Sequence, residues 1–326
     1  MKRILALRTD RFGEFLLIIP ALRALKEAYP ESKIVLAISP QVKELANLID
    51  CVDEVLEWDS IKRRLRQYRF DSCILFNPLK EANIAAFLAG IPVRCGYDRK
   101  WGFLLNRKIK DTKHLGNRHE VICNLELVAL LIRGQALGER PLGDRHLGSL
   151  PASRQSVPDF SLCIPDTDKY RDLAEAIAIH PFTSDPVKQW SVERFIELAD
   201  KISQELNTRV VLIGKGLEGD TLQSRVSPSD KVINLLNKTS LVELAQVLKQ
   251  CKLLVTCDSG PMHLAAAVGT PVVALFRNDL AGKTAKRWGP RGEGHTVIER
   301  SRLEDISVDE VMRVVKDKLF AISIKD

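Results

Sequence analysis

Short apolar runs alternate with amphipathic stretches along almost the whole chain, and this pattern constrains the fold more than any other feature. Such alternation predicts a mostly parallel sheet covered by helices on both faces. The expected strands are 3–7, 33–38, 54–57, 71–76, 93–96, 176–180, 209–213, 231–234, 253–256, 271–276 and 295–298. The expected helices are about 14–28, 41–49, 60–68, 80–89, 117–133, 191–206, 217–226, 240–250, 261–268 and 307–320.

The alternation breaks between about residues 134 and 160, where glycine and proline accumulate and long apolar runs are rare. A chain of 326 residues is also long for one domain and suits two domains of about 150 residues each. We therefore predict an α/β protein with two Rossmann-like, doubly wound domains, 1–150 and 151–326, facing each other across a cleft. The last helix, about 307–320, is a candidate to pack back on the N-terminal domain.

Parallel sheets bind ligands at the carboxyl ends of their strands. After the expected strand 253–256, Asp258, Ser259 and Gly260 lead into an Ala-rich helix with Pro261 in its first turn. The N–H groups and dipole of such a helix start form an anion site that suits a diphosphate. Alternatively, Asp258 or Ser259 caps the helix and no ligand binds. His263, one turn further on, is either a ligand contact or a packing residue.

The loop after the expected strand 176–180 offers two hydroxyls and a cation, Thr183, Ser184 and Lys188, just before a helix that Ser191 would cap. Hydroxyls and an ammonium group in one loop suit phosphate oxygens. In the alternative interpretation the hydroxyls form turn hydrogen bonds and the lysine is solvated.

Glu218 follows two glycines, Gly214 and Gly216, at another expected strand-to-helix turn. Its carboxylate could accept hydrogen bonds from ribose hydroxyls, or it could complement the helix dipole. The spacing is not that of a Gly-x-Gly-x-x-Gly fingerprint, and no Walker-type Gly-Lys-Ser/Thr is present.

The first expected strand leads into a turn with two carboxylates, Asp10 and Glu14, and with Gly13 before a helix. Either carboxylate could act as a general base if it points into the cleft. Otherwise Glu14 stabilises the helix start, and Asp10 forms a turn or an ion pair with Arg8 or Arg11.

Taken together, these loops give the chain a resemblance to glycosyltransferase family nine, the ADP-heptose:lipopolysaccharide heptosyltransferases and their relatives. The matching segments occur in order over nearly the whole chain. The first comprises Gly13-Glu14 and 16–22, and the second runs from His180-Pro181 through Lys188-Gln189-Trp190-Ser191 to 193–195. The others are 258–267, 269–276 and Arg287-Trp288-Gly289-Pro290.

The resemblance implies a GT-B fold with an N-terminal acceptor domain and a C-terminal donor domain, and inverting transfer without a metal or another cofactor. It places Thr183, Ser184 and Lys188 in a phosphate-binding loop. Asp258, Ser259 and Gly260, with His263 beside them, would contact the sugar and diphosphate, and Glu218 the ribose.

The resemblance also implies a catalytic base directly after the glycine of the first loop. The family has aspartate at that position, whereas this chain has Glu14. The carboxylate is retained but moves outward by one methylene, and reaction geometry is sensitive to shifts of about 1 Å. Glu14 is therefore the expected base and Asp10 the alternative.

The charge of the chain is unevenly distributed. The whole net charge of +7 lies in residues 1–150, which hold 25 Lys and Arg against 18 Asp and Glu. This excess favours acidic partners, namely a phosphorylated glycolipid, an anionic membrane surface or nucleic acid. No nucleic-acid-binding module accompanies it. The candidate acceptor contacts are Arg63, Arg64, Arg99 and Lys100, although a solvated basic surface is the alternative.

The expected location is the cytoplasm, peripheral to the inner face of the inner membrane. The apolar run near Met1 is too short for a signal peptide. The seven cysteines lack the spacing of a zinc site or a disulfide framework and are expected in the core. The expected donor is a nucleotide sugar, first of all ADP-heptose. Two other hypotheses remain: the same fold with another nucleotide sugar and glycan acceptor, and a catalytically degenerate nucleotide-sugar binding protein.

Overall fold

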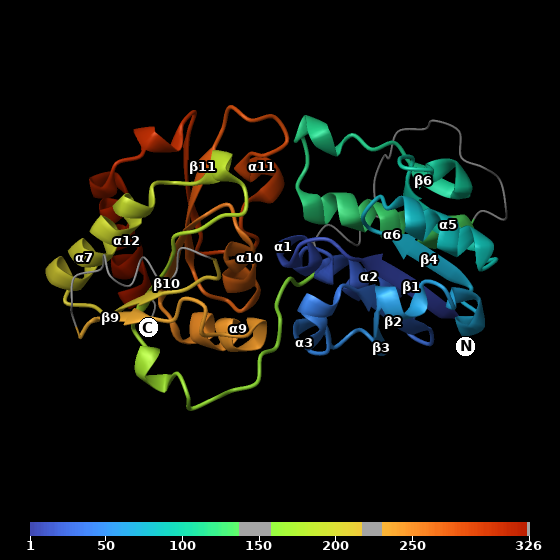
Figure 1. Cartoon of the computed structure of the whole chain (residues 1–326), viewed down its shortest axis with the longest axis horizontal. Helices are drawn as coiled ribbons and strands as arrows, with labels where there is room; N and C mark the ends of the chain where they lie inside the picture. Colours follow the sequence, from blue (N-terminus) through green and yellow to red (C-terminus); the bar gives the residue numbers. More distant parts are fainter. Residues whose placement is uncertain (137–157, 217–229, 325–326) are drawn as a thin grey trace. The chain divides into compact units, whose positions relative to one another are not determined.

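The computed structural model describes residues 1–136, 158–216 and 230–324. The chain divides into two compact units, Met1–Phe160 and Ser161–Asp326 (Figure 1). The predicted boundary between residues 150 and 151 and the predicted helix at 217–226 lie outside the described residues.

In the described part of the first unit, six parallel strands form a sheet in the order β3-β2-β1-β4-β5-β6. This is the order typical of Rossmann folds, in which the progression of strands reverses between the first and the fourth. The strands are β1 (Arg3–Arg8), β2 (Lys33–Ile38), β3 (Glu54–Glu57), β4 (Ser72–Leu75), β5 (Val93–Tyr97) and β6 (Arg107–Ile109). The helices of this unit are α1 (Phe12–Leu16), α2 (Ile19–Ala28), α3 (Lys43–Ala46), α4 (Trp58–Ile61), α5 (Lys80–Leu88) and α6 (Glu120–Ala136).

The second unit repeats this topology. Its six described strands are also parallel, in the order β12-β11-β10-β7-β8-β9, so that β7 and β10 flank its reversal point. They are β7 (Ile177–His180), β8 (Val210–Leu212), β9 (Val232–Asn234), β10 (Leu253–Cys257), β11 (Val272–Arg277) and β12 (Thr296–Arg300). The described helices are α7 (Val192–Glu205), α9 (Leu241–Gln250), α10 (Gly260–Ala267), α11 (Ala285–Trp288) and α12 (Val308–Ser323).

The inner strands of each sheet are buried on both faces. In the first unit, Leu5 of β1 packs in a cluster with Trp58 of α4 and Ala86 of α5. Ile4, which points to the opposite face, is 2% exposed, and α6 contacts β4 and β5. Parallel strands that are buried on both faces consist of continuous apolar residues, so their positions can be predicted well from the sequence.

In the second unit, α7 and α12 lie on one side of the sheet and α9 and α10 on the other (Figure 1). Val311 and Val315 of α12 pack in the same core cluster as Phe195 of α7 and Val255 of β10. The final helix, a candidate to pack on the N-terminal domain, thus contributes its buried residues to the core of the second unit.

The predicted α/β class and the Rossmann-like character of both units are confirmed, with local differences. The helix predicted over 14–28 is divided into α1 and α2, because Pro20 lacks the N–H that a continuous helix would need there. Strand β6 and helix α11 were not predicted. Short 3-10 turns connect several elements: η1 (Pro40–Val42), η2 (Leu65–Tyr68), η3 (Gly102–Leu104), η4 (Lys113–Leu115), η6 (Arg171–Leu173), η7 (Pro186–Lys188) and η8 (Leu303–Asp305).

All seven cysteines carry free thiols, and six are buried as predicted, whereas Cys163 is exposed. Among the described residues, no helix is both long and apolar enough to cross a membrane.

Candidate active site

The carboxyl ends of β7 and β10 lie side by side at the reversal point of the second sheet, with Thr256 paired to His180 in the strand register. The loops that follow these strands bring two predicted donor residues together. The Lys188 ammonium forms an ion pair with the Asp258 carboxylate, and the two side chains are only 16% and 9% exposed. A cation is thus held in a partly dehydrated position, where its interactions are stronger than at an open surface. The solvated interpretation of Lys188 is wrong.

Helix α10 begins beside this ion pair. Its N-cap residue is Ser259, whose hydroxyl makes no capping hydrogen bond and instead lies 3.0 Å from Thr256 Oγ1. The capping interpretation of Ser259 is therefore wrong. The first turn, which starts at Gly260 with Pro261 next, keeps N–H groups that can bind an anion.

A short chain of polar atoms lies beneath this helix start. His180 Nδ1 is 3.0 Å from Thr256 Oγ1, which in turn contacts the Ser259 hydroxyl. Burial lowers the pKa of His180 to about 3, so its ring is neutral at physiological pH. Gly214 permits this packing: it has φ +137°, and a Cβ there would lie 2.9 Å from His180 Cδ2. The arrangement fixes the Ser259 rotamer.

The loop after β7 is held mainly by its own hydrogen bonds. The Thr183 hydroxyl donates to the Asp185 carbonyl and accepts from the Asp185 N–H, both at 3.0 Å. The turn interpretation is therefore confirmed for Thr183, while Ser184 is exposed. Lys283 Nζ lies 2.8 Å from Asp185 and lowers the pKa of that carboxyl. Lys283 is a second cation near this loop that the sequence did not indicate.

The remaining predicted donor residues are Glu218 and His263. Glu218 lies outside the described residues. The loop before it is anchored by Asn237, whose side chain bonds both the N–H and the carbonyl of Gly216 at 3.0 Å. His263 is 3% exposed within α10, as its packing interpretation expects.

The first unit also has polar groups at its reversal point, where β1 and β4 are paired. Thr9 and Asn77, from the loops after these strands, exchange two hydrogen bonds of 3.4 and 3.3 Å. The loop that carries both candidate bases is thereby tied to the neighbouring strand.

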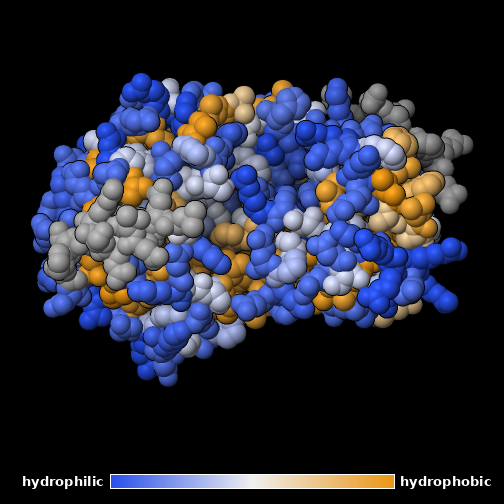
Figure 2. All heavy atoms as spheres, in the orientation of Figure 1, coloured by the Kyte–Doolittle hydropathy of each residue, from blue (hydrophilic) through white to orange (hydrophobic). Residues whose placement is uncertain are grey.

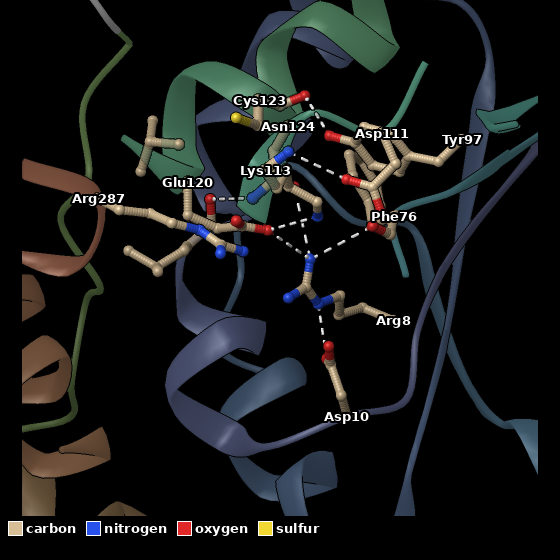
Figure 3. A network of polar contacts seen from close by, with 12 residues as sticks. Arg8, Asp10, Phe76, Tyr97, Asp111, Lys113, Glu120, Cys123, Asn124 and Arg287 are labelled. Atoms are coloured by element: carbon tan, nitrogen blue, oxygen red, sulfur yellow. Dashed lines mark hydrogen bonds and ion pairs between the residues drawn. The ribbon is translucent and has the colours of Figure 1, made fainter. Parts of the chain in front are cut away.

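A buried charge network supports this loop (Figure 3). Arg8 is 2% exposed, and its Nε donates to Asp10 Oδ1 at 2.6 Å. Its Nη1 contacts Glu120 at 3.5 Å and Asn124 at 3.4 Å, and Lys113 pairs with Glu120 at 2.8 Å. Burial alone would lower the pKa of the Arg8 guanidinium, but Asp10 and Glu120 outweigh it and raise that pKa. The predicted ion pair of Asp10 with Arg8 is confirmed.

Glu14 lies in the first turn of α1 and is half-buried. Burial raises the pKa of its carboxyl, and the negative charge of Asp10 adds to this effect, which Arg8 and Arg11 partly offset. A carboxyl group with a raised pKa is a better proton acceptor when deprotonated. The two carboxylates thus differ: Asp10 is bound by Arg8, whereas Glu14 has increased basicity.

The candidate acceptor residues occupy two exposed segments of the first unit. Arg63 and Arg64 follow α4, and Arg64 donates to the Ser60 carbonyl at 3.2 Å. Arg99 and Lys100 follow β5, and Arg99 pairs with Asp111 at 3.1 Å. Two of the four cations therefore already have partners within the chain.

Two Rossmann-like units in one chain match the GT-B fold of solved heptosyltransferase structures. The model of glycosyltransferase family 9 (heptosyltransferase) matches residues 58–312. The chain belongs to this family and is a glycosyltransferase. The matched range contains Lys188 and Asp258 but not Asp10 or Glu14.

A curated relative agrees with this assignment, and solved structures share the fold. Lipopolysaccharide heptosyltransferase 2 of Salmonella typhimurium is 26% identical over 295 residues, which cover 84% of this chain and 82% of that protein. The structure of Escherichia coli ADP-heptose lps heptosyltransferase II superimposes with a TM-score of 0.79 at 22% identity, covering 99% and 100% of the two chains. E. coli heptosyltransferase WaaC with ADP gives a TM-score of 0.74 at 19% identity, covering 97% and 99%.

Proposed function

We propose that this chain transfers a heptose or a related sugar from a nucleotide diphosphate donor, first of all ADP-heptose, to an acceptor of the lipopolysaccharide core type. The observation that carries the proposal is the Lys188–Asp258 pair beside the start of α10, which has no cap from its N-cap side chain. The names of the relatives support both the heptosyl donor and the lipopolysaccharide acceptor.

The donor diphosphate would bind at the carboxyl end of the second sheet. Its oxygens would accept hydrogen bonds from the Lys188 ammonium and from N–H groups of the first turn of α10, near Gly260. Asp258 holds the ammonium in this position. Thr183 and Ser184 would also contact the phosphates, and Glu218 would contact the ribose.

Transfer would proceed by one displacement at the anomeric carbon. Glu14 removes the proton from the acceptor hydroxyl as its oxygen attacks, and Asp10 is the alternative base. The bond between the anomeric carbon and the diphosphate oxygen breaks on the opposite face, so the configuration inverts. Lys188 and the helix dipole stabilise the charge that develops on the leaving diphosphate, without a metal.

The acceptor would be a phosphorylated glycolipid, with Arg63, Arg64, Arg99 and Lys100 as its candidate phosphate contacts. Such an acceptor places the enzyme in the cytoplasm, peripheral to the inner face of the inner membrane. The basic excess of residues 1–150 is consistent with this location.

The test begins with thermal unfolding in the presence of ADP-, GDP- and UDP-sugars, because a ligand that binds the native state raises the unfolding temperature. The stabilising donor is then incubated with a heptose-deficient core acceptor, with and without EDTA, and the product is analysed by mass spectrometry and NMR. Heptosylation with inverted configuration, unaffected by EDTA, is expected. Transfer from another sugar nucleotide would show that the donor is not ADP-heptose. Tight binding with no transfer from any donor would favour a degenerate binding protein.

A further inference from the structure

Four large apolar side chains of the first unit are exposed on two elements that contact each other, α5 and η3. Phe87 and Leu88 end α5 and are 49% and 70% exposed, and Trp101 and Phe103, at η3, are 45% and 67% exposed. Helix α5 contacts η3, and the rings of Trp101 and Phe103 lie 5.6 Å apart. Figure 2 shows hydrophobic surface gathered where α5 and β6 lie in Figure 1. We call these four residues the α5–η3 face.

The backbone that presents this face is held in an unfavourable conformation. Lys100 and Trp101 are consecutive non-glycine residues with φ values of 47° and 70°. Such left-handed conformations cost free energy and persist only where surrounding contacts enforce them. Here Asn83 Nδ2 donates to the carbonyls of Arg99 and Lys100, at 3.5 and 2.9 Å. These hydrogen bonds therefore hold the backbone that keeps Trp101 exposed.

Cations surround the apolar residues. Lys80 Nζ lies 4.3 Å from the Trp101 ring centre, and the Arg94 guanidinium lies 5.5 Å from that of Phe87. Lys100 is exposed on the same loop as Trp101. The nearby acidic groups are balanced, because Asp98 pairs with Lys108 and Asp111 with Arg99, each at 3.1 Å. Glu81 of α5 pairs with Lys62 at 3.5 Å. The rim of the face is thus positively charged.

We propose that the α5–η3 face docks the enzyme on an anionic membrane surface. Large contiguous apolar patches on soluble proteins mark interaction sites. Tryptophan and phenylalanine are suited to the boundary between headgroups and acyl chains, and lysine and arginine bind anionic headgroups. The proposal rests on the proposed function, because a glycolipid acceptor requires the enzyme at a membrane.

The charge of the rim argues against a second copy of this chain as the occupant. A two-fold interface pairs the same surface with itself. Such pairing would bring Lys80, Arg94 and Lys100 of both copies together, and the repulsion would oppose association. An anionic lipid surface instead complements the same charges.

The test is co-sedimentation of the full chain with vesicles of phosphatidylcholine alone or with phosphatidylglycerol. Binding is expected only to the anionic vesicles and should weaken as salt is added. Leu88→Ser/Phe103→Ser should lower the affinity about tenfold or more, because two exposed apolar side chains no longer enter the interface. The matched control is Phe320→Ala, since Phe320 is 70% exposed on α12 of the second unit.

Tryptophan fluorescence gives a second, independent measurement. Trp58 and Trp190 are buried, at 3% and 0% exposure, and the fourth tryptophan, Trp288, is half-buried on α11 of the second unit. A blue shift on anionic vesicles should therefore come mainly from Trp101 and be lost in Trp101→Phe. Equal vesicle binding by wild type and the double variant would overturn the proposal. So would concentration-dependent dimerisation that the double variant abolishes. Stabilisation by nucleotide, measured without vesicles, reports separately on the proposed function, so the two can fail independently.

Discussion

At the level of single residues, the two carboxylates after β1 stand in different environments. Arg8 binds Asp10 at 2.6 Å, while burial and Asp10 raise the pKa of Glu14. If Glu14 is the base, Glu14→Gln should lower kcat by about 10²- to 10⁴-fold and leave the donor dissociation constant unchanged. Steady-state kinetics and donor titration measure the two quantities. Full activity in Glu14→Gln together with loss in Asp10→Asn would move the base to Asp10.

The pH dependence of kcat/KM tests the same assignment. A base is active when deprotonated, so activity should fall as the pH drops through the raised pKa of Glu14, above the ordinary value of 4.5. Asp10→Asn removes a neighbouring negative charge and should shift this acidic limb to lower pH. A limb that stays in place or moves to higher pH in Asp10→Asn would contradict the predicted coupling.

His180 should make folding stability depend on pH. Its pKa is about 3 in the folded protein but near 6.5 when unfolded, so below pH 6.5 the unfolded state takes up a proton that the native state does not. Stability is therefore lost as the pH falls from 6.5 towards 3, by up to about 1.4 kcal/mol per pH unit.

His180→Asn, which keeps a polar partner for Thr256 but does not titrate, should flatten this dependence. Urea unfolding at pH 7.5 and 5.5 measures the difference between wild type and variant, which removes contributions common to both. Replacing the exposed His114 by Asn is the matched control. If wild type and His180→Asn lose equal stability, His180 is not buried as a neutral ring.

At the level of elements, α9 begins with a capping box formed by Ser240 and Glu243. The Ser240 hydroxyl accepts from the Glu243 N–H at 3.2 Å, and the Glu243 carboxylate accepts from the Ser240 N–H at 2.9 Å. Ser240→Ala should lower the free energy of unfolding by about 1 kcal/mol, whereas Ser240→Asp should keep most of it. Chemical denaturation measures both, and an alanine variant as stable as wild type would contradict the capping role.

The strands and helices also show how much of the secondary structure the local sequence pattern predicts. The predicted strands were located to within about two residues of their ends, because a strand buried on both faces is a continuous apolar run. Strand β6, with the sequence RKI at the sheet edge, has no such run and was missed. The division of α1 from α2 was readable in principle from Pro20.

Less of the candidate site than of the fold could be predicted from the sequence, because several contacts of the site depend on the sheet topology. Lys188 and Asp258 could be proposed because each follows a predicted strand. The contacts of Arg8 with Glu120 and of His180 with Thr256 join residues 112 and 76 positions apart. Such pairs depend on strand order and register, which local periodicity does not determine.

At the level of the whole molecule, the two units share one strand order but carry different groups at their reversal points. Both sheets reverse between their first and fourth strands. The reversal point of the first unit holds carboxylates and a buried arginine, whereas that of the second holds a lysine beside a helix start that its N-cap side chain does not cap. We therefore propose that the first unit activates the acceptor and the second unit binds the donor.

We propose above all that the second unit binds the donor diphosphate through Lys188. Isothermal titration of ADP, with GDP and UDP for comparison, tests it most directly in wild type, Lys188→Ala and Lys249→Ala. Lys249 is the matched control, because it also pairs with an aspartate, Asp166 at 2.7 Å, but on α9.

A charge-assisted hydrogen bond contributes about 1.5–3 kcal/mol, so Lys188→Ala should weaken nucleotide binding about 10- to 100-fold while Lys249→Ala leaves it unchanged. An unchanged dissociation constant in Lys188→Ala would remove Lys188 from the donor site and contradict the account.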